Sequence, residues 1–261
     1  MDYSIRPMNM GWVEMDKSLF TYKMNFGVPT KCMMNSFYIE GVKDKHIIVD
    51  AGCDGKQVMS KWPKSNAAST RGKPGKPIAG HIQTFEEALD KLGLVPNDID
   101  LVIQTHCMID HIANLTKCKK AKILMQIDEL NFALSPHPYK GAYEPNLIQE
   151  VHESHKNGQC KVVSGDLEVE EGINVLFTPG HSHGCQSVSV ETKKGTAIIA
   201  GNCSMKENWY PPKDYPYHVI PSGIHWDVLK TFDNMIRIKS NADIIVPLHC
   251  PEITKEPVIG I

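Results

Sequence analysis

The 261-residue sequence lacks several features that would assign it to a class of protein at once. It has no run of about 18 consecutive apolar residues, so we expect no membrane helix. No apolar segment follows the first residues, as a secretory signal would require. Neither sign of charge dominates, because 28 Lys and Arg stand against 30 Asp and Glu. Such a surface attracts neither nucleic acid nor an anionic membrane, and we expect a cytoplasmic protein without these partners.

The eight cysteines include no Cys-x-x-Cys pair, which is the usual spacing of structural zinc sites and redox motifs. A disulfide framework is the alternative, but a chain of this length buries a core without one, and the missing signal argues against export. We therefore expect mostly free thiols. Cys107, Cys203 and Cys250 lie next to the candidate site residues described below, and we expect them to pack behind those residues.

Internal repeats and low-complexity tracts are also missing, and the hydrophobic fraction of 41% is that of an ordinary globular protein. No shift of composition marks a boundary, so we predict one domain over residues 1–261. Residues 62–80 are rich in Lys, Pro, Gly and Ser and predict an exposed loop. This loop is either a solvated insertion or a lid over a pocket.

Short runs of Val, Ile and Phe alternate with helical patterns, which indicates an α/β layered fold. Thr84 and Glu87 form a capping-box pattern for a helix that ends at Gly93. An amphipathic helix is predicted at 226–238. The predicted strands are 34–40 and 46–50, joined as a hairpin, and then 100–105, 123–125, 174–178, 197–200 and 243–248.

Polar segments follow four of these strands, and one of them carries Asn202 after strand 197–200. His106, Asp110 and His111 lie in one short segment after strand 100–105, His181 follows a Thr-Pro-Gly turn, and His249 follows the last strand. Imidazole suits Zn, Fe and Mn, and a carboxylate among imidazoles suits the harder of these ions. Each histidine alone fits a structural role, and Asp110 alone fits a helix N-cap. The joint pattern predicts a metal site.

These segments resemble the metallo-β-lactamase superfamily, in particular its lactonase-like hydrolases, such as the acyl-homoserine-lactone and pyridoxolactone hydrolases. The resemblance runs from about residue 35 to residue 252. Asp50-Ala51-Gly52 is similar to the family's Asp-x-Gly, and the segment from His106 to His111 is similar to its His-x-His-x-Asp-His motif. The resemblance implies an α/β fold of four layers, an αββα sandwich, with metal ions at its centre.

The family holds two ions, and the resemblance implies which residues of this chain correspond to their ligands. One ion is bound by the motif aspartate, the last motif histidine and the C-terminal histidine. This set is intact here as Asp110, His111 and His249, and Asp110 is also expected to take part in catalysis.

The other set is incomplete, because it keeps only His106 and His181. Met108 replaces its third histidine, and Asn202 replaces the aspartate that bridges the two ions. A thioether is a poor ligand for Zn, Mn or Fe(II), and an amide lacks the charge that offsets two dications about 3.5–4 Å apart. We therefore predict one divalent ion, with His106 and His181 as general base or acid. A weaker alternative lets His183 complete a metal site with them.

The substrate pocket is the least determined part of the site. Tyr210, Tyr215 and Tyr217 follow Asn202 in a Pro-rich loop. They are predicted to line a pocket together with Met108 and Asn202, or to donate a hydroxyl to an oxyanion. Packing within the loop itself is an equal alternative.

The leading hypothesis is a metal-dependent hydrolase, with Mn, Zn or Fe, that opens a small cyclic carbonyl compound such as a lactone by attack of metal-activated water. One alternative is hydrolytic C–C cleavage of a cyclic 1,3-diketone. A second is a relative that binds a ligand without catalysis, and redox chemistry at an iron site is a third. The expected partner is a small-molecule substrate, and a homodimer is the assembly that we consider.

Overall fold

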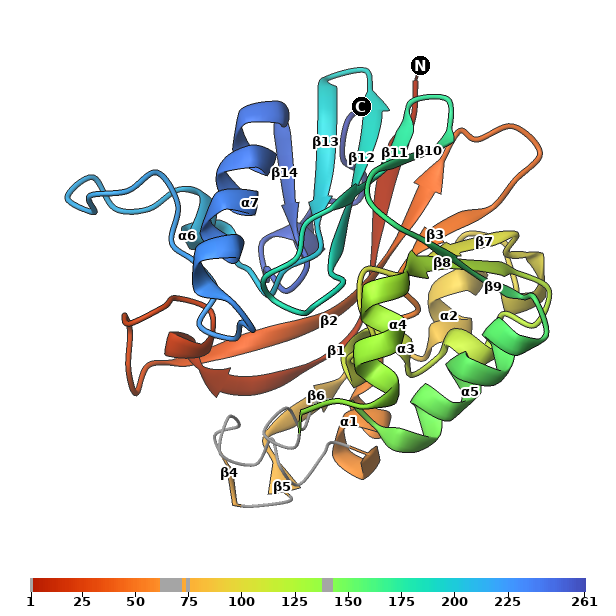
Figure 1. The fold of residues 1–261 in the computed structure, drawn as a ribbon, viewed down its shortest axis with the longest axis horizontal. Helices are drawn as coiled ribbons and strands as arrows, with labels where there is room; N and C mark the ends of the chain where they lie inside the picture. The colour runs from red at the N-terminus through yellow and green to blue at the C-terminus, as the bar shows by residue number, and fades with distance from the viewer. Residues whose placement is uncertain (1, 62–71, 74–75, 138–142) are drawn as a thin grey trace.

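The computed structural model describes residues 2–61, 72–73, 76–137 and 143–261. Two β-sheets lie face to face at its centre, with helices on the outer side of each (Figure 1). The expected four-layer αββα sandwich is confirmed. Within the described ranges, no helix has both the length and the apolar character needed to span a bilayer.

The first sheet combines a long antiparallel pair with a parallel half. Its strands, in spatial order, are β6 (Ala79–His81), β1 (Ser4–Asp16), β2 (Pro29–Glu40), β3 (Ile47–Val49), β7 (Leu101–Ile103), β8 (Lys122–Gln126) and β9 (Cys160–Val163). β1 and β2 pair antiparallel, whereas β3, β7, β8 and β9 are parallel. Since parallel strands end at the same edge, the loops after β3, β7 and β8 lie together.

The second sheet is mainly antiparallel. Its strands, in spatial order, are β10 (Leu167–Glu170), β11 (Ile173–Phe177), β12 (Gln186–Thr192), β13 (Gly195–Ala200) and β14 (Ile244–Pro247). β13 and β14 are parallel, with Ala200 opposite Pro247, so the loops that carry Asn202 and His249 leave the sheet side by side. A separate two-stranded ribbon pairs β4 (Gly72–Lys73) with β5 (Lys76–Pro77).

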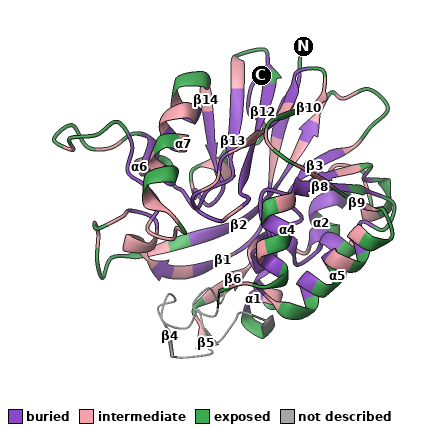
Figure 2. Cartoon of the chain, viewed as in Figure 1, coloured by how far each residue is buried: buried purple, intermediate pink, exposed green. Residues whose placement is uncertain are grey.

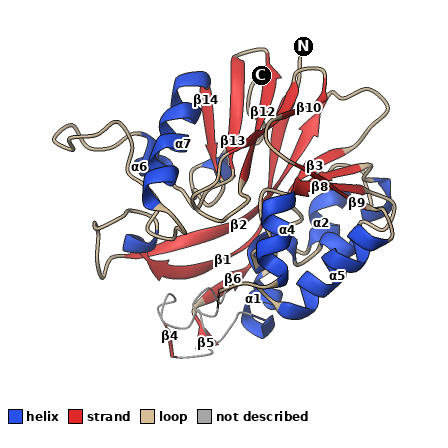
Figure 3. Ribbon diagram, viewed as in Figure 1, coloured by secondary structure: helices blue, strands red, loops and turns tan. Residues whose placement is uncertain are grey.

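Helices form the two outer layers, as the blue segments of Figure 3 show. The helices are α1 (Gly55–Lys61), α2 (Phe85–Asp90), α3 (Ile109–Ile112), α4 (Ile127–Leu134), α5 (Pro145–Lys156), α6 (Lys206–Trp209) and α7 (Val228–Asn241). Buried residues of α2 to α5 pack on the first sheet, and those of α7 pack on the second.

The buried residues form three apolar layers (Figure 2). Ile47 and Val49 of β3 point into the layer between the sheets, while Ile48 points to the helices. On β13, Ile199 joins the middle layer and Ile198 packs against α7. Each fully buried side chain of this size contributes about 1.5–3 kcal/mol. Burial on both faces explains why these strands appear in the sequence as unbroken apolar runs.

Most predicted elements are confirmed. Strands 34–40 and 46–50 pair as β2 and β3, and the Thr84–Glu87 capping box starts α2. All eight cysteines are free and buried. The helix predicted at 226–238 starts two residues later and continues to Asn241, with the Asp227 side chain accepting hydrogen bonds from the backbone N–H groups of Leu229 and Lys230.

The predicted loop at 62–80 is only partly described, because 62–71 and 74–75 lie outside the described residues. The prediction of a loop is wrong for the last residues of this segment. Ala79 and Gly80 belong to β6 and pair with Val13 and Trp12 of β1. A side chain at Gly80 would overlap the Trp12 ring, so glycine here serves close packing between two strands rather than an open loop.

Candidate metal centre

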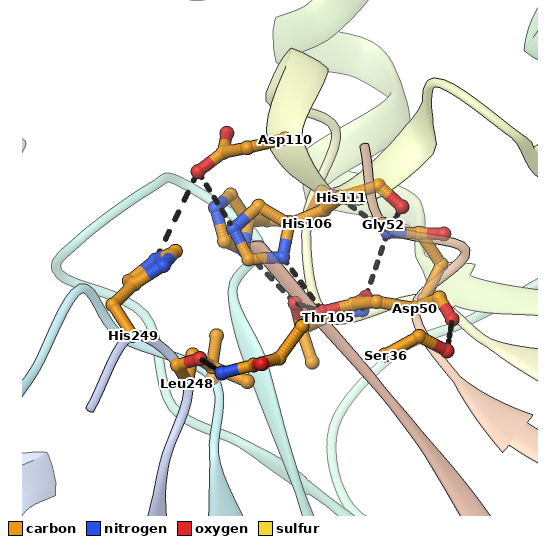
Figure 4. A network of polar contacts seen from close by, with 12 residues as sticks. Ser36, Asp50, Gly52, Thr105, His106, Asp110, His111, Leu248 and His249 are labelled. Carbon is orange, nitrogen blue, oxygen red and sulfur yellow. Dashed lines mark hydrogen bonds and ion pairs between the residues drawn. The ribbon is translucent and has the colours of Figure 1, made fainter. Parts of the chain in front are cut away.

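The five predicted metal-site residues come together, and Figure 4 shows four of them, namely His106, Asp110, His111 and His249. Asp110 Oδ2 lies 3.4 Å from His111 Nε2 and 3.9 Å from His249 Nε2. His106 Nε2 lies 3.3 Å from His181 Nε2, and the rings of His106 and His111 have centroids 3.9 Å apart. We call Asp110, His111 and His249 the ligand triad, and His106 and His181 the histidine pair.

Hydrogen bonds at Nδ1 determine how three of the four imidazoles are turned. Each donates to an oxygen atom that can only accept: His111 to Asp50 Oδ2 at 2.7 Å, His181 to the Ile224 carbonyl oxygen at 2.7 Å, and His249 to the Met33 carbonyl oxygen at 2.9 Å. Nδ1 therefore carries the proton in each neutral ring. Nε2 is left with its lone pair directed into the site, which is the arrangement of metal-binding histidines.

Thr105 orients the fourth imidazole. Its hydroxyl donates to Asp50 Oδ2 at 2.8 Å, and His106 Nδ1 lies 3.0 Å from the same hydroxyl oxygen. Because the only hydroxyl proton goes to the carboxylate, His106 Nδ1 is the donor and its Nε2 also carries a lone pair. The Nε2 atoms of the histidine pair thus face each other at 3.3 Å.

Asp50 holds this arrangement together. It is fully buried, and its carboxylate accepts from Gln104 Nε2 at 2.7 Å and Thr105 N at 2.7 Å, in addition to the Thr105 hydroxyl and His111. Its backbone φ of +58° is in the left-handed region, where Asp and Asn are tolerated better than most residues. In the sequence, Asp50 was identified only as part of a segment similar to a family motif. Its hydrogen bonds in the structure show that it orients His111 and Thr105.

The charges of the site attract a cation to the ligand triad. Burial alone would lower the pKa of His111, but the negative charges of Asp110 and Asp50 outweigh burial and raise this pKa to about 10. Burial also opposes ionisation of Asp110, yet His111 holds the pKa of its carboxyl below the usual range. The histidine pair behaves differently, since burial lowers the pKa of His106 and lowers that of His181 to about 3.

The ligand triad fits a divalent ion. Two imidazoles and one carboxylate form a set that binds a metal and leaves positions open for water and substrate. His111 Nε2 is buried; within the described part of the chain it makes no hydrogen bond, and it faces Asp110 Oδ2 at 3.4 Å. A buried polar atom of this kind needs a partner, and a cation coordinated by the triad would supply it.

Glu129 of α4 joins the two loops that carry the histidine pair. It is fully buried and accepts from Cys107 N at 2.9 Å on one loop, and from the Ser182 hydroxyl at 2.6 Å and Gly184 N at 3.0 Å on the other. Burial raises the pKa of its carboxyl against these hydrogen bonds. Glu129 was not among the predicted site residues, because its role depends on two loops that come from distant parts of the chain.

Cys32 was missed as well. Its Sγ, a carboxylate oxygen of Asp110 and a ring nitrogen of His249 all lie within 4.8 Å of one another. The cysteine sits in β2, and its side chain is 1% exposed. In the sequence it precedes the predicted strand 34–40, and nothing local indicates that this part of the chain passes beside the metal site.

Met108 and Asn202 occupy different surroundings. Met108 is the N-cap of α3 and packs in the apolar layer between the first sheet and its helices. Asn202 is buried, accepts from the Ser204 hydroxyl at 3.0 Å, and lines a small cavity of about 10 Å³ together with His181. Asn202 therefore stands beside the histidine pair, as its position in the family motif implies.

The ring contacts of the three predicted pocket tyrosines are with residues outside the metal site. Tyr210 lies near Lys239 Nζ, and the Tyr217 ring packs against Tyr215 and Phe232. Tyr210 and Tyr217 are more than half exposed. Among the described residues, none of their ring contacts reaches the ligand triad or the histidine pair, so their place in a substrate pocket stays a prediction.

His183 does not join the histidine pair. Its ring stacks on Phe132 with centroids 4.1 Å apart and contacts Trp226 at the same distance. The weaker alternative, in which His183 completes a metal site, is not supported by this placement.

Comparisons with known proteins agree with the fold. The family model of the metallo-beta-lactamase superfamily matches residues 29–249. The N-acyl homoserine lactonase AiiA of Bacillus thuringiensis subsp. kurstaki is 31% identical over 111 residues, which are 42% of this chain and only 40% of that protein. The N-acyl homoserine lactonase AiiB of Agrobacterium fabrum is 22% identical over 223 residues, covering 78% of this chain and 79% of that protein.

Solved structures share the fold at low sequence identity. An N-acyl homoserine lactone hydrolase with its product N-hexanoyl-L-homoserine bound at the catalytic metal centre superposes with a TM-score of 0.73 at 23% identity, covering 98% of this chain and 96% of that one. The dizinc quorum-quenching lactonase AidC superposes with a TM-score of 0.63 at 15% identity, covering 95% and 88%.

Proposed function

The chain belongs to the metallo-β-lactamase superfamily, and we propose that it is a metal-dependent hydrolase that opens a small cyclic carbonyl compound, with lactones as the first candidates. The observation that carries this proposal is the close grouping of four histidine rings with the Asp110 carboxylate. The partial sequence match to N-acyl homoserine lactonases supports a lactone as the substrate class.

We further propose that the ligand triad holds one divalent ion, which is Mn, Zn or Fe. The histidine pair offers only two protein ligands, because Met108 packs in the core and Asn202 is a neutral amide. Two imidazoles without an anionic partner bind a dication weakly, whereas the triad adds a carboxylate. The histidine pair is therefore left for proton transfer.

A bound ion would polarise the substrate carbonyl and lower the pKa of a coordinated water towards about 7. The histidine pair is neutral, because burial lowers the pKa of both rings. Its two Nε2 atoms are 3.3 Å apart and can hold one proton between them. His106 and His181 thus accept the proton that water loses on adding to the carbonyl, and return it to the ring oxygen that leaves.

The experiment is a substrate panel on protein purified without chelator and loaded with Zn, Mn or Fe. Lactones yield hydroxy acids and cyclic 1,3-diketones yield oxo acids, so mass spectrometry of the products separates the two ring-opening reactions. We expect lactone opening by the wild type and none by Asp110→Ala. The matched control is Asp128→Ala, which removes an exposed carboxylate from α4. Metal-loaded wild type that opens neither class of ring, or an active Asp110→Ala variant, would contradict the proposal.

A further inference from the structure

The ligand triad has a fourth potential ligand beside it, the thiol of Cys32. Cys32 Sγ, an Asp110 carboxylate oxygen and a His249 ring nitrogen lie within 4.8 Å of one another. Around a tetrahedral zinc ion, ligand atoms are about 3.3–3.6 Å apart, given Zn–N and Zn–O distances of about 2.0–2.1 Å and a Zn–S distance of about 2.3 Å. A small side-chain rotation thus brings all three atoms onto one ion.

The cysteine comes from an element that the metal motif does not include. β2 carries Cys32 opposite Val13 of β1, and the carbonyl oxygen of the next residue, Met33, accepts the Nδ1–H of His249 at 2.9 Å. The same stretch of β2 therefore both orients one triad imidazole and presents a sulfur atom to it. The hydrogen bond between Met33 and His249 therefore holds Cys32 next to the expected position of the ion, and Cys32 lies in a strand.

Charge supports the same assignment. Asn202 leaves the site without the carboxylate that bridges two ions in the family, so the ligand triad supplies a single negative charge, from Asp110. A dication buried with one carboxylate keeps a net positive charge, which is costly away from water. A thiolate adds the second negative charge, and a coordinating thiol loses its proton outright, to solvent.

We propose that the Cys32 thiolate is a fourth protein ligand of the ion held by the ligand triad, and that the site prefers Zn²⁺ or Fe²⁺ to Mn²⁺. Thiolate is a soft ligand that selects zinc and iron, whereas manganese prefers oxygen ligands. Zinc in catalytic sites sometimes expands to five ligands, so four protein ligands still leave one position, which the attacking water takes. This inference rests on the proposed single-ion hydrolase and specifies its metal.

The test is the absorption spectrum of the Co²⁺-substituted full-length protein, measured without substrate. A thiolate ligand produces a strong near-ultraviolet charge-transfer band, which imidazole and carboxylate ligands do not. We expect the band in the wild type and in Cys203→Ser, whose thiol is also buried, and its loss in Cys32→Ser. Competition with a chromophoric chelator should show Zn²⁺ affinity lowered at least about 100-fold in Cys32→Ser, beyond the roughly 10–100-fold effect of changing a residue behind a ligand.

Three results would overturn the assignment. They are a wild-type spectrum without the band, a band kept by Cys32→Ser, and a band lost in Cys203→Ser. The first and third remain decisive even if Cys32→Ser does not fold. The spectrum is independent of turnover, so a lactonase without the band refutes only the cysteine ligand, and a band without lactonase activity refutes only the proposed function.

Discussion

Replacing Asp50 with asparagine should weaken metal binding by moving a proton on His111, without changing any ligand. The backbone φ of +58° at Asp50 suits asparagine as well as aspartate, so the local fold is retained. One carboxylate oxygen accepts from Gln104 and the Thr105 N–H, and the other from the Thr105 hydroxyl and His111. In Asp50→Asn, an NH₂ group must take the place of one of these oxygens.

The two orientations of this amide differ in cost. In one orientation the NH₂ group faces Gln104 Nε2 and the Thr105 N–H, which are donors and cannot accept a hydrogen bond. Each buried donor left without a partner lowers the stability by about 1–3 kcal/mol. In the other orientation the NH₂ group faces the Thr105 hydroxyl and His111. Both can accept a hydrogen bond once their own protons have moved. The second orientation therefore prevails, and His111 accepts at Nδ1 and carries its proton on Nε2. The lone pair needed for the metal is then blocked.

Loss of a residue that orients a ligand reduces metal affinity roughly 10–100-fold, which is about 1.4–2.8 kcal/mol. We expect a drop of this size in Asp50→Asn, measured by chelator competition, with lactone turnover falling in parallel. The control is Asp233→Asn on the exposed face of α7. If Asp50→Asn bound metal within about twofold of the wild type, the tautomer argument would be refuted.

Four further outcomes are expected. Asp110→Ala should lose its metal on desalting, as metal analysis would reveal. Met108→His combined with Asn202→Asp should raise the metal content from about one ion to about two, because it restores the ligands of a two-metal site. Urea unfolding of the metal-free protein should show a stabilising contribution of His111 that is full below about pH 6.5, the ordinary histidine pKa, and is lost as pH rises through about 10, the raised pKa of His111. His181, whose pKa is lowered to about 3, contributes in the opposite sense, so stability also falls as the pH drops below about 6.5. Glu129→Gln should lower the free energy of unfolding by about 1–3 kcal/mol, because an NH₂ group then faces buried donors.

Much of the fold followed from local patterns. Apolar runs such as 243–248 and the Thr84 capping box depend on neighbouring residues alone, and they appear in the structure as β14 and α2. The long strand β1 was missed, because Ser4–Asp16 is rich in methionine rather than β-branched residues and has a register shift between Asn9 and Gly11.

The ligand triad could be predicted because the segment from His106 to His111 and the histidine after the last predicted strand resemble the ligand segments of the family. Cys32 and Glu129 could not, because their roles depend on which strands and helices pack next to the site. Glu129 reaches two loops only through the placement of α4 on the first sheet. Such contacts join residues far apart in the chain, and no local pattern encodes them.

The most direct test of the single-ion site is anomalous diffraction from zinc-loaded crystals at the zinc absorption edge. The account predicts one anomalous peak, within about 2.0–2.2 Å of Asp110, His111 and His249. Two peaks, or no peak between these three side chains, would contradict it.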